Sequence, residues 1–178
     1  MKRTRSVVAV SLAGLALVVG LLFTSPQVVL AHCQIPCGIY DDAMRFTMLE
    51  EHITTIEKSM NQVVALAENP SENANQLVRW VVNKENHADY FAEIVTQYFL
   101  QQRIKPVEPG NGPEREAYIE KVTLCHQMLV ATMKAKQTTD LQYVAQLRSL
   151  VAAFRRAYFT PEEEKKLEED KRHGTHTH

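Results

Sequence analysis

Apolar side chains recur every three or four residues over four long stretches of this chain. The stretches span residues 46–67, 77–98, 118–132 and 141–158. A step that alternates between three and four places these side chains on one face of an α-helix. No segment alternates apolar and polar residues at period two, as a half-buried β-strand would. The pattern therefore predicts an all-α protein.

Each predicted helix has an inner face that is defined by its apolar or small residues. In chain order these are Phe46, Leu49, Ile53, Ile56, Met60, Val63 and Ala67; Leu77, Val81, Ala88, Phe91, Val95 and Tyr98; Tyr118, Val122, Cys125, Leu129 and Thr132; Leu141, Val144, Leu147, Val151, Phe154 and Tyr158. Because the connections between the stretches are short, neighbouring helices must run antiparallel. We therefore expect an up-and-down four-helix bundle over residues 41–159.

Capping and breaking residues mark the ends of these helices. Asp41 and Asp42 are N-cap candidates for the first helix, and Asn69-Pro70 ends it. Residues 101–112 contain two prolines and two glycines and are expected to form a loop. Pro113 suits the first position of the third helix.

A run of polar side chains interrupts the second stripe. It consists of Asn83, Lys84, Glu85, Asn86 and His87. One interpretation is a solvated helix face, which is what most charged runs are. The alternative is a polar layer that supports a metal-binding segment.

The chain ends in a charged tail, residues 160–178. Thr160-Pro161 followed by acidic residues predicts a helix start, and residues 161–172 are expected to form a short exposed helix. The last six residues, which hold three histidines, are expected to be disordered. These histidines either gather metal ions or are an incidental end.

Residues 1–31 have the pattern of a removable signal peptide. Lys2, Arg3 and Arg5 precede an uncharged apolar stretch, and Val29 and Ala31 suit signal peptidase cleavage before His32. We therefore expect export to the periplasm or the extracellular space. An uncleaved membrane anchor is the alternative; without it, the processed chain has no membrane segment.

Loss of the three basic leader residues takes the formal net charge from −1 to −4. That balance argues against nucleic-acid binding, and it means that an anionic substrate must be attracted by local charge. In an oxidising compartment Cys33 and Cys37 could form a disulfide. Cys125 lies in a helical apolar pattern and is expected to be a buried structural thiol.

Residues 32–40, the N-terminal hook, carry the chemistry of the chain. Cleavage would give His32 a free amine beside its imidazole, close to the thiols of Cys33 and Cys37. Pro36 forbids a continuous helix and bends the segment. Thiolates, an amine and a backbone amide form a square-planar set that favours Ni(II) or Cu(II), and nickel fits better because Cu(II) tends to oxidise thiolates.

The sequence His-Cys-x-x-Pro-Cys-Gly-x-Tyr ahead of a four-helix bundle resembles the nickel superoxide dismutase family. The resemblance implies an antioxidant enzyme that converts superoxide to oxygen and hydrogen peroxide by Ni(II)/Ni(III) cycling. It implies that the His32 amine and imidazole, the Cys33 amide, and the Cys33 and Cys37 thiolates hold nickel. Tyr40 would line the substrate approach, and the subunits would form a homohexamer.

Three positions depart from the family's usual residues. Gln34 stands where the family has Asp, Met48 where it has Glu, and His87 where it has Arg. Glu50 and Glu51 lie near Met48. In the family, the Asp orders the hook, and the Glu and the Arg orient the hook histidine. A non-enzymatic exported metal-binding bundle, or a bundle with a structural Cys33–Cys37 disulfide, is the alternative function.

Overall fold

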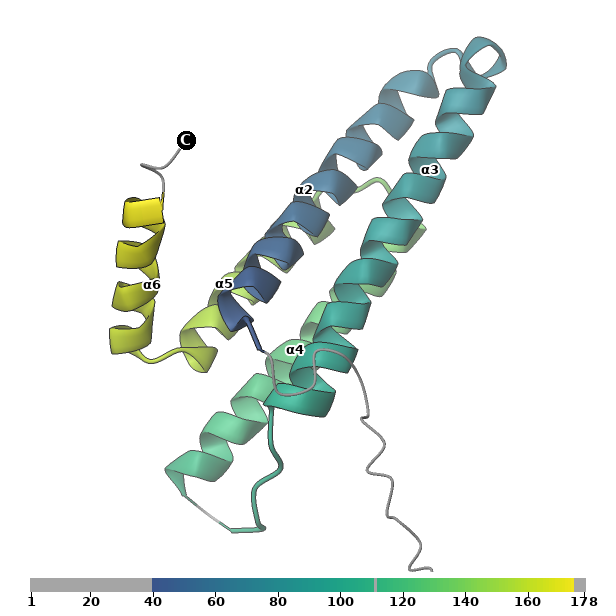
Figure 1. Cartoon of the computed structure of the whole chain (residues 1–178). Coiled ribbons are helices and arrows are strands. Elements are labelled where there is room, and N and C mark those ends of the chain that lie inside the picture. Colours follow the sequence, from purple (N-terminus) through teal and green to yellow (C-terminus); the bar gives the residue numbers. More distant parts are fainter. Residues whose placement is uncertain (1–39, 111, 175–178) are drawn as a thin grey trace, which may run out of the picture. The chain divides into compact units, whose positions relative to one another are not determined.

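A computed structural model describes residues 40–110 and 112–174 of the chain. Within these ranges it contains helices α2 (Asp42–Leu66), α3 (Pro70–Glu93), η1 (Ile94–Arg103), α4 (Pro113–Gln137), α5 (Gln142–Tyr158) and α6 (Pro161–Gly174). Helix α3 continues directly into η1, so α2, α3–η1, α4 and α5 form the four antiparallel rods of the bundle (Figure 1). The predicted all-α antiparallel bundle is confirmed for these residues.

Each rod packs against its neighbours in chain order, and α5 closes the bundle against α2. The core contains most of the predicted inner-face residues, and it is densest where three phenylalanines meet. Phe46 of α2, Phe99 of η1 and Phe154 of α5 are fully buried, with ring centroids 4.9–5.4 Å apart. Aromatic contacts of this kind add about 0.5–1.5 kcal/mol per pair beyond the burial of their area.

The residues of α4 that face the core differ slightly from the predicted ones. Leu129 is only partly buried, whereas Met128, Ala131 and Ala135 are fully buried beside the predicted Cys125. Small residues at 131 and 135 made the inner face hard to recognise, because alanine is neutral in a hydrophobic pattern. Cys125 is confirmed as a buried thiol.

Of the two interpretations of residues 83–87, the solvated face does not hold at Lys84, whereas Asn86 is exposed. The side chain of Lys84 is buried, and its Nζ donates to the carbonyl oxygens of Ala135 (3.0 Å), Lys136 and Thr138 (3.4 Å). These carbonyls are the unpaired acceptors at the carboxyl end of α4, where a positive charge also opposes the helix dipole. Glu85 forms an ion pair with the same ammonium group at 3.1 Å.

Helix α4 therefore ends beside Lys84, and the preceding part of α3 has no α4 to pack against. In Figure 1 the α2–α3 hairpin extends past the turn between α4 and α5. Val81, which was expected on the inner face, is 39% exposed, and Val78 and Val82 are exposed as well. The apolar pattern of α3 extends over Val78, Val81 and Val82, but α4 ends before it could cover these side chains.

The polar caps agree with the predicted helix starts. Asp41, not Asp42, caps α2 by accepting a hydrogen bond from the Met44 amide at 2.8 Å. Thr160 and Glu163 form reciprocal backbone–side-chain hydrogen bonds at the start of α6. Helix α6 runs to Gly174, two residues past its predicted end, and residues 175–178 lie outside the described ranges.

None of the helices in the described ranges is long and apolar enough to cross a membrane. Residues 1–31, the predicted leader, lie outside these ranges.

Replacement of Lys84 by methionine, which keeps an unbranched side chain but removes the ammonium group, should lower the free energy of unfolding by about 2–3 kcal/mol. The reason is that three carbonyl groups lose a charged donor. Urea unfolding at neutral pH measures the change. Lys165→Met, an exposed position on α6, is the matched control and should change stability by less than about 0.5 kcal/mol. Equal effects of the two substitutions would contradict this role of Lys84.

Candidate functional site

The carboxylate of Asp42 joins three helices at the start of the bundle. It accepts hydrogen bonds from the hydroxyl groups of Tyr98 (2.7 Å) and Tyr158 (3.0 Å). Arg103 donates to both carboxylate oxygens, with Nε at 2.8 Å and Nη2 at 2.5 Å. We call these four residues the Asp42 cluster. It connects the first turn of α2 to η1 and to the last residue of α5.

The π-helix η1 explains how Tyr98 and Arg103 reach the same carboxylate. Hydrogen bonds from residue i+5 to residue i place residues five apart on one side of a π-helix, as the Ile104 amide shows by donating to the Phe99 carbonyl at 2.8 Å. In an α-helix, at 100° per residue, the same two side chains would point about 140° apart. The sequence predicted a loop from residue 101, so this geometry was not expected.

Tyr40, the one predicted site residue within the described ranges, is held by the Asp42 cluster. The Arg103 guanidinium lies over its ring, 4.3 Å from the centroid, and the Tyr98 ring meets it edge-on at 5.9 Å. The Tyr40 side chain remains 37% exposed. The phenol is thus fixed in position while it stays open to solvent.

The cluster also sets the protonation of its members. Burial works to raise the pKa of Asp42, but the hydrogen bonds from Arg103, Tyr98 and Tyr158 outweigh it and the pKa lies below its ordinary value. Burial, together with the Asp42 carboxylate, raises the pKa values of Tyr98 and Tyr158. At neutral pH the cluster is therefore one ion pair with two neutral phenols.

Arg103 is also one of the residues that line a pocket of about 300 Å³. Its lining includes the cations of Arg103, Lys105 and Lys121, the phenols of Tyr118 and Tyr158, and a single carboxylate, that of Glu114. Since Arg103 is paired with Asp42, Lys105 and Lys121 are the cations that give this pocket its positive character. It is a local basic region in a chain whose net charge is negative.

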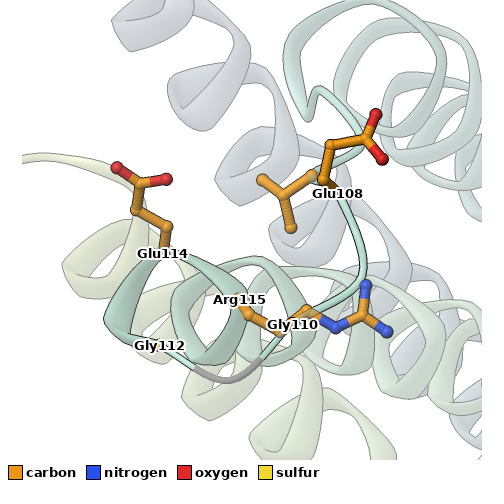
Figure 2. A pocket seen from close by; sticks show the side chains of 6 residues that line it. Glu108, Gly110, Gly112, Glu114 and Arg115 are labelled. Atoms are coloured by element: carbon orange, nitrogen blue, oxygen red, sulfur yellow. The ribbon is translucent and has the colours of Figure 1, made fainter.

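A second pocket, at the loop before α4, has no converging chemistry. Its charged lining residues are Glu108, Glu114 and Arg115. Figure 2 shows the two carboxylates pointing away from one another. We do not assign this pocket a ligand.

The three predicted nickel ligands, His32, Cys33 and Cys37, lie outside the described ranges, as does Gln34. Within those ranges there is no group of three or more His, Cys, Asp or Glu side chains that could hold a metal ion. Cys125 is the one cysteine there, and burial raises the pKa of its thiol to about 12. A protonated, enclosed thiol is a poor metal ligand.

The positions where this chain departs from the expected family residues have other partners. Met48 is partly buried, and its sulfur accepts a hydrogen bond from Arg45 at 3.5 Å. Glu50 is paired with Arg148 at 3.3 Å. The ring of His87 faces that of His52 across α2 and α3, with their Nδ1 atoms 3.0 Å apart.

Sequence reasoning missed Arg103 and His52, and it gave Asp42 and Tyr98 only capping and core roles. A signal for the cluster exists: two consecutive aspartates, Asp41 and Asp42, stand at the start of α2, and a helix needs only one N-cap. The second carboxylate must then find another partner or remain in solvent.

An all-α bundle preceded by a segment with two thiols and a histidine defines a class of helical metalloproteins. Comparison with known families is more specific. Residues 27–162 match the family model of nickel-containing superoxide dismutase, and the chain belongs to this family. It is therefore an enzyme of superoxide dismutation with a nickel cofactor.

One relative is the Superoxide dismutase [Ni] of Streptomyces seoulensis. It is 29% identical over 133 residues, which cover 71% of this chain and 89% of the relative. No solved structure gives a significant match. The family match includes the whole hook, residues 32–40.

Substitution of Asp42 by asparagine should lower the free energy of unfolding at pH 7 by about 2 kcal/mol, because the partly buried Arg103 guanidinium loses its counter-charge. The folded-state pKa of Asp42 is depressed. Its stabilising contribution is therefore present above about pH 4, the ordinary pKa, and is lost as the pH falls toward the folded-state value. The difference between the two proteins in urea unfolding should shrink on acidification below pH 4.

Asp89→Asn is the matched control, since this carboxylate is exposed and pairs with Lys136 at 2.7 Å. It should cost less than about 1 kcal/mol. If the Asp42 and Asp89 variants were equally stable, the Asp42 cluster would not have the role described.

Proposed function

We propose that the mature chain binds nickel at its N-terminus through the His32 amine and imidazole, the Cys33 amide, and the thiolates of Cys33 and Cys37. The observation that carries the proposal is the family match, which includes these residues. Two features support it. The described residues offer no competing group of three ligands, and Cys125 is enclosed. When bound, nickel supplies the one-electron chemistry that converts superoxide to oxygen and hydrogen peroxide.

The role we propose for Tyr40 is to line the substrate approach and to place a phenol proton near the reaction. Tyr40 follows Cys37 by three residues, so it is close along the chain to any ion held by that thiolate. Its ring is fixed by Arg103 and Tyr98, and more than a third of the side chain is exposed. A phenol or a water molecule can deliver one of the protons that peroxide formation requires.

Signal peptidase cleavage after Ala31 completes this site, in our proposal. The support is the leader pattern of residues 1–31 and the need for a free amine at His32. The mature enzyme would then act in the periplasm or outside the cell.

A chain that retains Ala31 should bind no nickel at the hook and should lack superoxide dismutase activity. The retained residue turns the His32 amine into an amide, which is a poor donor unless it is deprotonated. Nickel content, measured by mass spectrometry of the metal, and a superoxide assay check this. A protease site placed before His32 provides the control, because cleavage should restore both properties.

Full activity of the uncut chain would contradict the role of the amine. A mature chain that is two mass units lighter and free of nickel would instead indicate a Cys33–Cys37 disulfide.

The basic pocket beside Arg103 would attract the anionic substrate toward Tyr40. Lys105 and Lys121 line it, and the Lys121 ammonium lies 5.8 Å from the centroid of the Tyr158 ring. Fixed cations near an entrance raise the encounter rate of an anion, and added salt screens the effect.

Replacement of Lys105 and Lys121 by glutamine should lower kcat/KM roughly threefold at low ionic strength and weaken its salt dependence. Nickel content should not change. Lys165→Gln with Lys166→Gln, on α6, is the control with the same loss of charge. The account of this pocket fails if both double variants have the same salt dependence.

We also propose that the subunits associate with copies of themselves, as a hexamer by resemblance to the family. Exposed apolar residues support an interface on the protruding hairpin. They are Val64 of α2 and Val78, Val81 and Val82 of α3. Several exposed large apolar residues on one hairpin are typical of an interaction surface.

A further inference from the structure

Two histidines face one another across α2 and α3. The Nδ1 atoms of His52 and His87 are 3.0 Å apart, and their ring centroids are 5.1 Å apart at an interplanar angle of 67°. The Tyr90 ring contacts both, with centroids at 5.8 Å from His52 and 5.7 Å from His87. Both imidazoles are half-buried. We call His52 and His87 the histidine pair.

A neutral imidazole has one nitrogen that donates and one that accepts. The observed contact is therefore a hydrogen bond only if one of the two rings carries its proton on Nδ1. If both rings carry it on Nε2, two lone pairs face each other at 3.0 Å, and that arrangement is favourable only with a cation between them. The geometry thus has two solutions, one with a shared proton and one with a bound metal ion.

The distance suits a metal ion. Imidazole nitrogens bind zinc at about 2.0–2.1 Å, and at adjacent corners of a coordination sphere two such nitrogens lie about 3 Å apart. Imidazole is a ligand for zinc, copper, nickel and iron, with Cu²⁺ binding most strongly among the divalent ions. The pair comes from two long, well-packed helices, so the bite is fixed before any ion arrives.

The protonation state of His52 meets a requirement of the metal-bound solution. Burial lowers the pKa of His52, and the nearby His87 lowers it further, while Glu51 acts in the opposite direction. Metal ligands must be unprotonated, and a depressed pKa keeps this ring neutral at physiological pH.

We propose that the histidine pair is a second metal site, in which the Nδ1 atoms of His52 and His87 hold one divalent transition ion of the copper–zinc class. Water molecules complete the coordination sphere on the solvent side. Neither ligand belongs to the N-terminal hook, and the proposal does not rest on nickel binding there.

Copper binding to a full-length chain that lacks the other clustered ligands tests the proposal. The parent for this test replaces His32, Cys33 and Cys37 by Gln, Ser and Ser, and His173, His176 and His178 by Gln. The histidines that remain are His52, His87 and His126. With one equivalent of Cu²⁺, pulsed electron paramagnetic resonance should show two coordinated imidazoles.

His52→Gln and His87→Gln should each remove one of the two imidazole signals, whereas His126→Gln, at an exposed position on α4, should leave both. Circular dichroism confirms the fold of each variant. If a variant does not fold, the number of imidazoles bound to Cu²⁺ in the parent still tests the proposal. A parent that binds no Cu²⁺, or binds it through fewer than two imidazoles, would overturn the proposal and leave a simple hydrogen bond. Two signals that survive either substitution would overturn it too.

Discussion

The ion pair between Asp42 and Arg103 is the interaction on which the described structure most depends. It lies where α2 begins, where η1 ends and where α5 ends, and two phenols complete its hydrogen bonds. A partly buried charge is destabilising when it is left unpaired, so displacement of any of the three helices would cost stability. The same guanidinium covers the ring of Tyr40. Tyr40, the last residue of the hook, is thus held against the bundle by the ion pair that joins α2, η1 and α5.

The Asp42 cluster requires the π-helix η1. This π-helix widens the last turns of the second rod so that residues 98 and 103 share one side, and it keeps Phe99 in the core beneath them. Lys84 has a related function earlier in the same rod. There its ammonium group donates hydrogen bonds to carbonyl oxygens at the carboxyl end of α4. At η1 and at the carboxyl end of α4, polar contacts between helices therefore contribute to the geometry of the rods in a way that the apolar stripes do not show.

The sequence predicted what depends on local periodicity. Steps of three and four identified all four rods, and the caps at Asp41 and Thr160 were readable because capping acts within three residues. Lys84, Val81 and Arg103 were misplaced for a different reason. Their environments depend on where α4 ends and on a π-helix, and both arise from contacts far apart in sequence. His52 was missed because a single histidine carries no signal until its partner is known.

For the candidate metal centre, the sequence is informative and the described structure is not. His32, Cys33 and Cys37 lie outside the described residues, yet their sequence pattern and the family match identify the chemistry. A short motif with rare donors needs no tertiary information. The roles of Met48, Glu50 and His87 do need that information, and in the described structure these residues have partners of their own.

The most direct test of the account is the metal content and superoxide dismutase activity of the mature chain that begins at His32. The account predicts close to one nickel ion per chain and an activity that rises in proportion to nickel loading. A pure and active protein that contains zinc or iron but no nickel would contradict it.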